Sequence, residues 1–266
     1  MKRINFLLIS LFVLLTSCQE DADKVIRTDL PAEAAQLFNI SEGWSESLYF
    51  ALLTFEEYQA LESTSSLPGC PNLIIENDTR KVFLDFDNEN ECLQTGTKKR
   101  SGKLIIEFSL SGGITPTWIL EYENYSFNGI SMRGIRTFRR NSPNDITENF
   151  DPITFKTTKD LTTVFSGNLT HSRGLSNSIG IISGGNITGI NPAGREFSVE
   201  IPNDRLMLST CFQNNELIPV TGTEIWEISR GSNKKVTHQL KYELIDSCKV
   251  AANVLLPDGR QLLLNP

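Results

Sequence analysis

The sequence predicts a mainly β protein: an antiparallel meander that forms a sandwich or an open barrel, preceded by short N-terminal helices. From residue 67 onward, short segments rich in β-branched and aromatic residues alternate in polarity and are bounded by Gly, Asn, Asp, Ser or Pro. No helical stretch long enough for a β-α-β crossover separates them, so neighbouring strands should run antiparallel. Before residue 67, apolar residues recur at helical spacing.

The N-terminus has the features of a lipoprotein signal. Lys2 and Arg3 precede an apolar run of 12 residues, "INFLLISLFVLL", which is too short to span a bilayer with ease and is typical of a secretory signal. The following "LTSC" resembles the lipobox of bacterial lipoproteins. That resemblance implies cleavage before Cys18 and acylation of its thiol and its new amino group, and two or three acyl chains hold a protein on a membrane stably. An ordinary cleaved signal with a chance cysteine is the alternative.

The residues after Cys18 indicate the destination. Gln19 stands where an inner-membrane retention signal has Asp, which favours a lipid anchor in the outer membrane. Glu20, Asp21 and Asp23 resemble the acidic signals that send some lipoproteins to the cell surface, but a solvated acidic linker would look the same. Both the periplasmic face and the cell surface stay open.

Four segments follow from these patterns. They are a signal peptide (1–17), an acylated cysteine with a polar tether (18–30), a helical N-terminal segment (31–66) and an antiparallel β domain (67–266). Pro31 stands at a first helical position, and we expect one short helix there. In the segment 45–63, Leu48, Leu52 and Phe55 lie near helical spacing, which predicts a second, amphipathic helix docked on the β domain.

Thirteen segments of the β domain are predicted strands. They cover residues 81–86, 103–110, 117–123, 129–138, 153–158, 163–170, 178–183, 195–201, 205–211, 222–229, 236–244, 249–256 and 260–265.

The cysteines predict a disulfide frame. Without Cys18, four remain in an exported chain: Cys70, Cys92, Cys211 and Cys248. Proximity favours the pairs Cys70 with Cys92 and Cys211 with Cys248, although four cysteines allow three pairings. A cross-pair such as Cys70 with Cys248, or a zinc site of four thiolates, stays open, but the zinc site would lack any C-x-x-C pair.

An acidic run, "LDFDNENEC", places Asp85, Asp87, Glu89 and Glu91 at alternate positions. It aligns with "LKYELIDSC" further along, and the two segments share the apolar positions and the cysteine but not the acids. A Ca²⁺ loop would need Gly at its sixth position, which here is Asn90. We interpret the acids as the solvated face of a strand, with a loose Ca²⁺ site or a catalytic carboxylate pair as alternatives; no metal or cofactor is expected.

Catalytic motifs are absent from the sequence. His171 and His238 are the two near-neutral bases. His238 shares its predicted strand face with Leu240 and Tyr242, which indicates a satisfied core histidine, and no nucleophile motif accompanies His171. The sequence therefore favours a non-catalytic protein and leaves a lipid-anchored hydrolase or glycan-processing enzyme as the alternative.

Candidate binding residues come from two groups. Trp118 and Tyr125 are of the types that stack on sugars or anchor protein partners, although Trp118 alternates like a half-buried strand residue. Arg133 and Arg136, with Arg139, Arg140 and the earlier Lys98, Lys99, Arg100 and Lys103, form basic islands that could meet lipopolysaccharide phosphates or acidic glycans. A net charge of −7 makes nucleic acid a poor partner.

Several structural motifs together resemble an uncharacterised family of exported all-β lipoproteins of Gram-negative bacteria. They are "LDF" before a cysteine, "RSGK", "NPAGREFSVEI" and the terminal "LPDGRQLLLN", and they cover about residues 68–266. The resemblance implies fold and export but no activity. We therefore expect an envelope or cell-surface lipoprotein that contacts the membrane through its lipid and binds a protein or glycan ligand.

Overall fold

A computed structural model describes residues 30–61, 67–87, 92, 94, 98–110, 115–173, 180–212, 216–231 and 234–265. The predicted signal peptide, Cys18, Glu89 and Glu91 lie outside the described residues.

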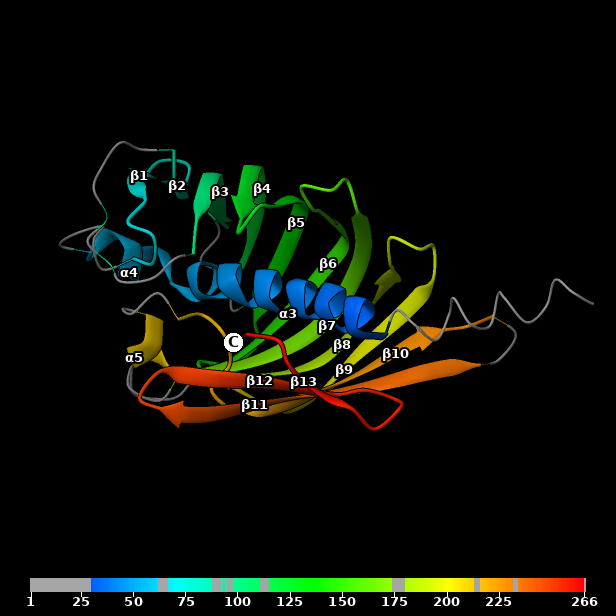
Figure 1. The fold of residues 1–266 in the computed structure, drawn as a ribbon. Helices are drawn as coiled ribbons and strands as arrows, with labels where there is room; N and C mark the ends of the chain where they lie inside the picture. The colour runs from blue at the N-terminus through cyan, green and yellow to red at the C-terminus, as the bar shows by residue number, and fades with distance from the viewer. Residues whose placement is uncertain are drawn as a thin grey trace, which may run out of the picture.

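The described chain forms one antiparallel sheet of thirteen strands, in which neighbours in sequence are neighbours in the sheet (Figure 1). The two end strands each pair on one side only, so the sheet is not closed, and the predicted mainly β meander is confirmed. The strands are β1 (Asn72–Glu76), β2 (Lys81–Asp85), β3 (Arg100–Phe108), β4 (Thr117–Phe127), β5 (Ile130–Arg140), β6 (Asp145–Lys156), β7 (Thr162–Arg173), β8 (Ile181–Ile190), β9 (Glu196–Met207), β10 (Gly222–Ser229), β11 (Lys235–Asp246), β12 (Lys249–Leu255) and β13 (Gln261–Leu263).

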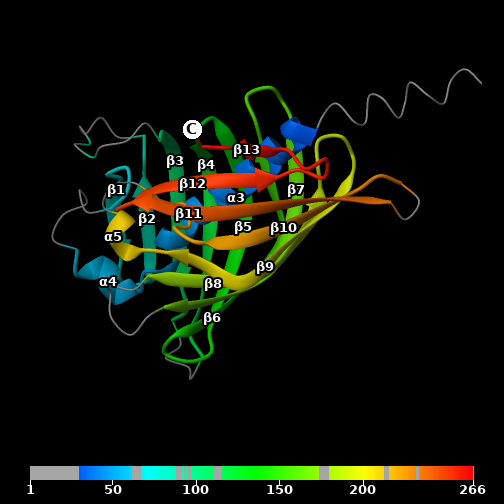
Figure 2. The same ribbon diagram turned by 60° about the horizontal axis from the view of Figure 1, so that its bottom comes forward.

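The sheet curls around one long helix, α3 (Leu30–Leu52), which lies along its concave face (Figures 1 and 2). Two shorter helices, α4 (Phe55–Gln59) and α5 (Ser209–Phe212), lie towards one end of the sheet. Apolar side chains of α3 and of the inward strand faces belong to a single hydrophobic cluster. The helix therefore fills the concave face and covers the side chains that the strands direct towards it.

The helical segment differs from its prediction. A single helix runs from Leu30 to Leu52 where two were expected, and Gly43 lies within it. Glycine weakens a helix interior by about 1 kcal/mol. Here the sheet leaves little room for a side chain, because a Cβ at Gly43 would stand 2.6 Å from Cε of Met132 and 2.8 Å from Cε2 of Phe155. Close packing on the sheet outweighs the local preference.

Prolines lie inside two of the strands that are longer than predicted. Pro152 in β6 and Pro202 in β9 lie where the register with the neighbouring strand shifts. Each strand therefore continues through a bulge instead of ending at its proline. As a result, the single strand β9 covers most of the predicted strand 195–201 and the start of the predicted strand 205–211. The rest of the second predicted strand belongs largely to α5. Strand β1 was not predicted, since none of its side chains is buried and its sequence, NLIIE, does not alternate in polarity.

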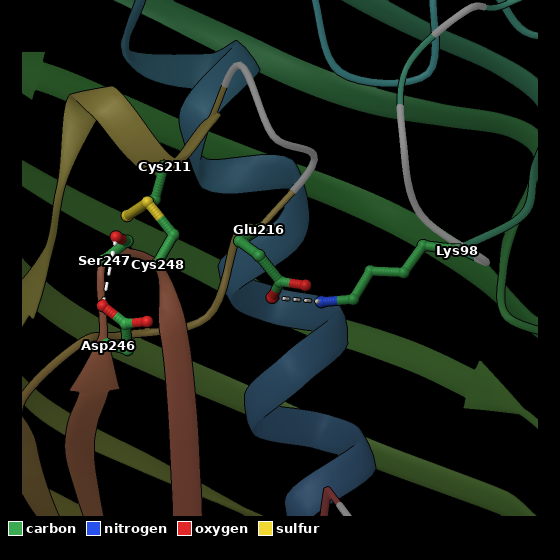
Figure 3. Close-up of a disulfide and its surroundings, with 6 residues drawn as sticks. All are labelled: Lys98, Cys211, Glu216, Asp246, Ser247 and Cys248. Atoms are coloured by element: carbon green, nitrogen blue, oxygen red, sulfur yellow. Dashed lines mark hydrogen bonds and ion pairs between the residues drawn. A yellow bond between two sulfur atoms is a disulfide. The ribbon is translucent and has the colours of Figure 1, made fainter.

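Two disulfides confirm the local pairing. Cys70 bonds Cys92 and Cys211 bonds Cys248, with Cα atoms 5.5 and 5.3 Å apart. The second bond joins α5 to the turn between β11 and β12 (Figure 3). The cross-pair and the four-thiolate zinc site are thereby excluded. Two disulfides indicate an oxidising, extracytoplasmic compartment.

Candidate functional site

The face of α3 that meets the sheet is polar as well as apolar, and charged strand residues point towards it. We call these side chains the buried polar network. Its members are Ser41, Ser45, Glu46 and Ser47 of α3, and Arg100, Tyr122, Tyr125, Arg136, Glu148, His171, Ser183, Arg205, Glu224 and Tyr242 of the strands.

The first cluster of the network centres on Glu148 of β6. Its Oε1 accepts a hydrogen bond from Nε of Arg136 at 2.5 Å, and its Oε2 lies 2.8 Å from Nε2 of His171. The other ring nitrogen of His171 lies 2.9 Å from the hydroxyl oxygen of Ser183. All four side chains are buried, so Glu148 links β5 and β7 directly and reaches β8 through His171.

Arg136 also holds the helix. Its Nη1 donates to the hydroxyl of Ser47 at 2.7 Å and to the carbonyl oxygen of Trp44 at 3.1 Å. The guanidinium carbons of Arg136 and Arg205 lie 5.5 and 4.5 Å from the centre of the Trp44 ring. Both cations therefore contact the same aromatic side chain of α3.

The second cluster centres on Arg205 and Glu224. Nε of Arg205 lies 2.8 Å from a carboxylate oxygen of Glu224, and its Nη2 donates to Ser41 and Ser45 of the helix. The hydroxyl of Ser41 donates to Glu224 at 2.6 Å and lies 2.8 Å from the hydroxyl of Tyr242. Strands β9, β10 and β11 are thus tied to one turn of α3.

Acidic side chains of α3 complete the docking. Glu46 accepts hydrogen bonds of 2.6 Å from Nε of Arg100 and from the hydroxyl of Tyr125. Near the start of the helix, Glu33 pairs with Arg195 at 2.6 Å and with both terminal nitrogens of Arg230. The helix is consequently fixed to the sheet along its length by charge-assisted hydrogen bonds.

These contacts set the protonation states. Burial opposes the charged form of Glu148, but the Arg136 charge and the hydrogen bond from His171 outweigh it and lower the pKa of this carboxyl to about 2. Burial lowers the pKa of His171, and Glu148 offsets only part of this effect. His171 is therefore neutral at pH 7. Burial also raises the pKa of Tyr125 and of Tyr242 well above the usual range, so both hydroxyls stay protonated.

Ser183, His171 and Glu148 have the connectivity of a hydrolytic triad. Because an ionised Glu148 only accepts, Nε2 of His171 must carry the proton, and Nδ1 accepts from the hydroxyl of Ser183. However, Ser183 and His171 are each only 1% exposed. A substrate would reach the hydroxyl only if the structure opened, so the trio holds strands together in this state.

The predicted binding residues lie in different surroundings. Trp118 is buried, and its Nε1 donates to the carbonyl oxygen of Ala51 in α3 at 2.6 Å. Tyr125 and Arg136 are buried members of the polar network, whereas Arg133 is exposed on β5. The structure does not bring these four residues together at one surface.

The earlier basic island is largely neutralised. Lys98 lies 3.4 Å from Glu42 and 3.5 Å from Glu216 (Figure 3), and Lys103 approaches Asp85 and Glu123 at 3.7 and 3.8 Å. Because Arg100 is also paired, these cations do not form a continuous basic surface.

The described part of the acidic run has a structural use. Asp87 accepts a hydrogen bond from the backbone nitrogen of Gly102 at 2.9 Å, and its own nitrogen donates to Asp85 at 3.0 Å. Glycine is required at position 102, since a Cβ there would stand 2.2 Å from the carbonyl oxygen of Asn124. The acids therefore stabilise a strand end here.

His238 is buried as predicted, but it is not satisfied. It lies opposite Trp226 in the sheet, and neither ring nitrogen has a hydrogen-bond partner in the described part of the chain. Burial lowers its pKa, so the ring stays neutral.

A groove of about 660 Å³ lies on the outer face of β7 to β10, opposite the helix. We call it the outer groove. Its lining includes the exposed side chain of Ile190 and the surface ion pair Glu227–Lys235. Four hydroxyl side chains also line it: Ser166, Thr188, Ser198 and Ser229. Pockets of this volume are typical of small-molecule sites. The groove can offer hydrogen bonds, apolar contacts and both signs of charge.

Sequence reasoning missed most of the network, although a signal existed. Glu224 shares an inward strand face with Trp226, and Arg205 shares one with Met207. A charged residue at the core parity of a strand must find a buried partner. That rule identifies the residues but not their partners, which come from other strands and from the helix.

The chain matches no known family model, no curated protein and no solved structure. The family resemblance therefore stays a prediction from the sequence motifs. No helix in the described part of the chain is both long and apolar enough to cross a bilayer.

Proposed function

We propose that this protein is a lipid-anchored lipoprotein of the outer membrane, displayed on the periplasmic face or at the cell surface, whose β domain is a non-catalytic binding or structural module. The anchor is Cys18, and the ligand is a protein or a glycan. The two disulfides support export, because such bonds persist in oxidising compartments.

The observation that carries the non-catalytic reading is the burial of the reactive groups. His171, Glu148 and Ser183 are enclosed between the sheet and α3, where their hydrogen bonds hold strands together. By contrast, the outer groove is accessible, and its lining includes hydroxyl and charged groups that recognise polar ligands. A rigid scaffold with an accessible polar groove suits recognition.

The proposed lipid anchor limits how far the start of α3 can lie from the membrane. Twelve positions separate Cys18 from Leu30, and a chain of that length spans at most about 40 Å. Near the start of α3, Glu33 pairs with Arg195, just before β9, and with Arg230, just after β10. An acylated Cys18 would therefore keep this end of the domain near the bilayer.

Array screening tests the binding role. Detergent-purified protein is applied to glycan and peptide arrays beside Ser198→Trp, which fills the outer groove, and Gln239→Trp, which adds the same bulk at an exposed position of β11 outside it. We expect saturable binding that Ser198→Trp abolishes and Gln239→Trp keeps. Equal binding by all three proteins would exclude the groove.

A hydrolase is the second candidate, because Ser183, His171 and Glu148 are connected as in a triad. A fluorophosphonate probe labels a serine that such a histidine activates. We expect no labelling of Ser183 in the folded protein. Labelling that is lost in Ser183→Ala and in His171→Gln would favour the enzyme instead.

A further inference from the structure

A second, smaller pocket lies between α4 and the ends of β3, β4 and β5, away from both the buried polar network and the outer groove. It encloses about 150 Å³. Its walls are mostly apolar, with the rings of Phe55, Phe108 and Trp118 among them, and two arginines, Arg80 and Arg140, line it as well. We call it the arginine pocket.

Both arginines are held against aromatic rings. The guanidinium carbon of Arg80 lies 4.5 Å from the centre of the Phe55 ring, and that of Arg140 lies 5.7 Å from the centre of the Trp118 ring. Trp118 is itself fixed by stacking on Phe138 at 5.6 Å and by its hydrogen bond to α3. The two cations are therefore preorganised by side chains that are part of the core.

The charges of the pocket are not balanced. One carboxylate, Glu56, approaches Arg80 at 3.1 Å, and its side chain is 69% exposed. Among the described residues the Arg140 side chain has no ion pair and no hydrogen bond, and Nε of each arginine is shielded from solvent without a partner. The two arginines and Glu56 together give the pocket one excess positive charge, although the net charge of the whole chain is −7.

Glu56 responds to both cations. Its pKa is lowered by its backbone hydrogen bond and by Arg80, and to a smaller extent by Arg140. An anion that entered the pocket would meet the same two guanidinium groups. An exposed pair such as Arg80–Glu56 contributes little to stability, so a ligand can compete with Glu56 at small cost.

We propose that the arginine pocket binds the carboxylate of a small ligand with a flat apolar body. The carboxylate bridges Arg80 and Arg140, whose planar forks suit its two oxygens. The body lies against Phe108 and Trp118. The volume is about that of a cavity that holds one benzene molecule. A single excess charge and apolar walls favour a monoanion over strongly hydrated sulfate or phosphate.

The test uses the whole acyl-free exported chain, with Cys18 replaced by Ser, and sodium benzoate as the probe. Titration at low ionic strength is followed by calorimetry and by tryptophan fluorescence, because Trp118 forms part of the wall. Sodium sulfate and benzyl alcohol are titrated in parallel. We expect saturable binding of benzoate, and much weaker binding of sulfate and of the neutral alcohol.

Four variants localise the site. Arg140→Gln and Arg80→Gln should weaken benzoate binding by about tenfold or more, since each removes a charged donor pair. Glu56→Gln should tighten it several-fold by removing the competing carboxylate, and the capping box of α4 stays intact because it uses Thr54 and Glu57. Arg139→Gln, which removes the same charge from the exposed neighbouring position, should leave binding unchanged.

Melting curves and near-ultraviolet spectra establish that each variant is folded. No saturable binding of benzoate to the wild-type chain overturns the proposal. Equal weakening by Arg139→Gln and Arg140→Gln also overturns it, because the effect would then be general attraction. Tighter binding of sulfate than of benzoate would contradict a carboxylate ligand and would indicate a phosphate-like one.

Discussion

Arg136 and Glu148 form an ion pair of 2.5 Å whose two side chains are both fully buried, on neighbouring strands beneath α3. The pair is completed by His171 on one side and by Ser47 and Trp44 of the helix on the other. A buried pair of this kind is costly to break, because the remaining charge stays buried without a counterion.

Removal of one partner should therefore destabilise the fold strongly. We expect Glu148→Gln to lower the free energy of unfolding by about 3 to 5 kcal/mol, since Arg136 keeps its charge without a counterion. Urea denaturation measures the change. The exposed pair Glu227–Lys235 is the control, and Lys235→Ala there should cost less than about 1 kcal/mol. Similar losses at the two positions would contradict the role of the buried network.

The same groups predict how stability depends on pH. The folded pKa of Glu148 is about 2, below the ordinary value of 4.5, so the stability it contributes is present above pH 4.5 and is lost as the pH falls towards 2. The folded pKa values of His171 and His238 are lowered from 6.5, so protonation favours the unfolded chain as the pH falls below 6.5. Melting temperatures should decline in two stages.

Two variants separate these stages. Glu148→Gln should flatten the decline between pH 4.5 and 2, whereas His238→Gln should reduce the decline below pH 6.5. A wild-type melting temperature that stays constant from pH 7 to pH 3 would contradict both assignments.

Gly43 should resist replacement even though it lies within a helix. Alanine is the better helix former by about 1 kcal/mol, but its Cβ would press on Met132 and Phe155. Overpacking costs about 1 to 3 kcal/mol, so we expect Gly43→Ala to be destabilising in thermal or urea unfolding. Ala35→Gly, at an exposed position of α3, measures the helix preference alone. A stabilised Gly43→Ala would show that the contact yields easily.

The acyl chains of Cys18 can be detected directly. Growth with a clickable palmitate should label the wild-type protein and place it in the membrane fraction, because the thiol and the new amino group carry acyl chains. Cys18→Ala should be unlabelled, and it should leave that fraction. Labelling of the variant, or an unlabelled wild type, would refute the lipoprotein assignment.

Particular residues show how far local patterns reach. The alternation along 222–229 and 249–256 predicted β10 and β12 closely, and the spacing of the cysteines favoured the two bonds that form. Where a proline lies inside a strand, as at Pro152 and Pro202, the local rule predicts an end and the sheet instead continues through a bulge. Pairing with both neighbours decides the outcome there.

The sequence by itself determined the mainly β class, the antiparallel order and the local disulfides, because these depend on side-chain alternation, on short connections and on cysteines that are close along the chain. Only the tertiary structure decided that α3 fills the concave face and that Arg136, Glu148 and His171 meet beneath it. The physical reason is distance along the chain. Ser41 and Tyr242 are 201 positions apart and touch only because the sheet curls, so no periodicity could pair them.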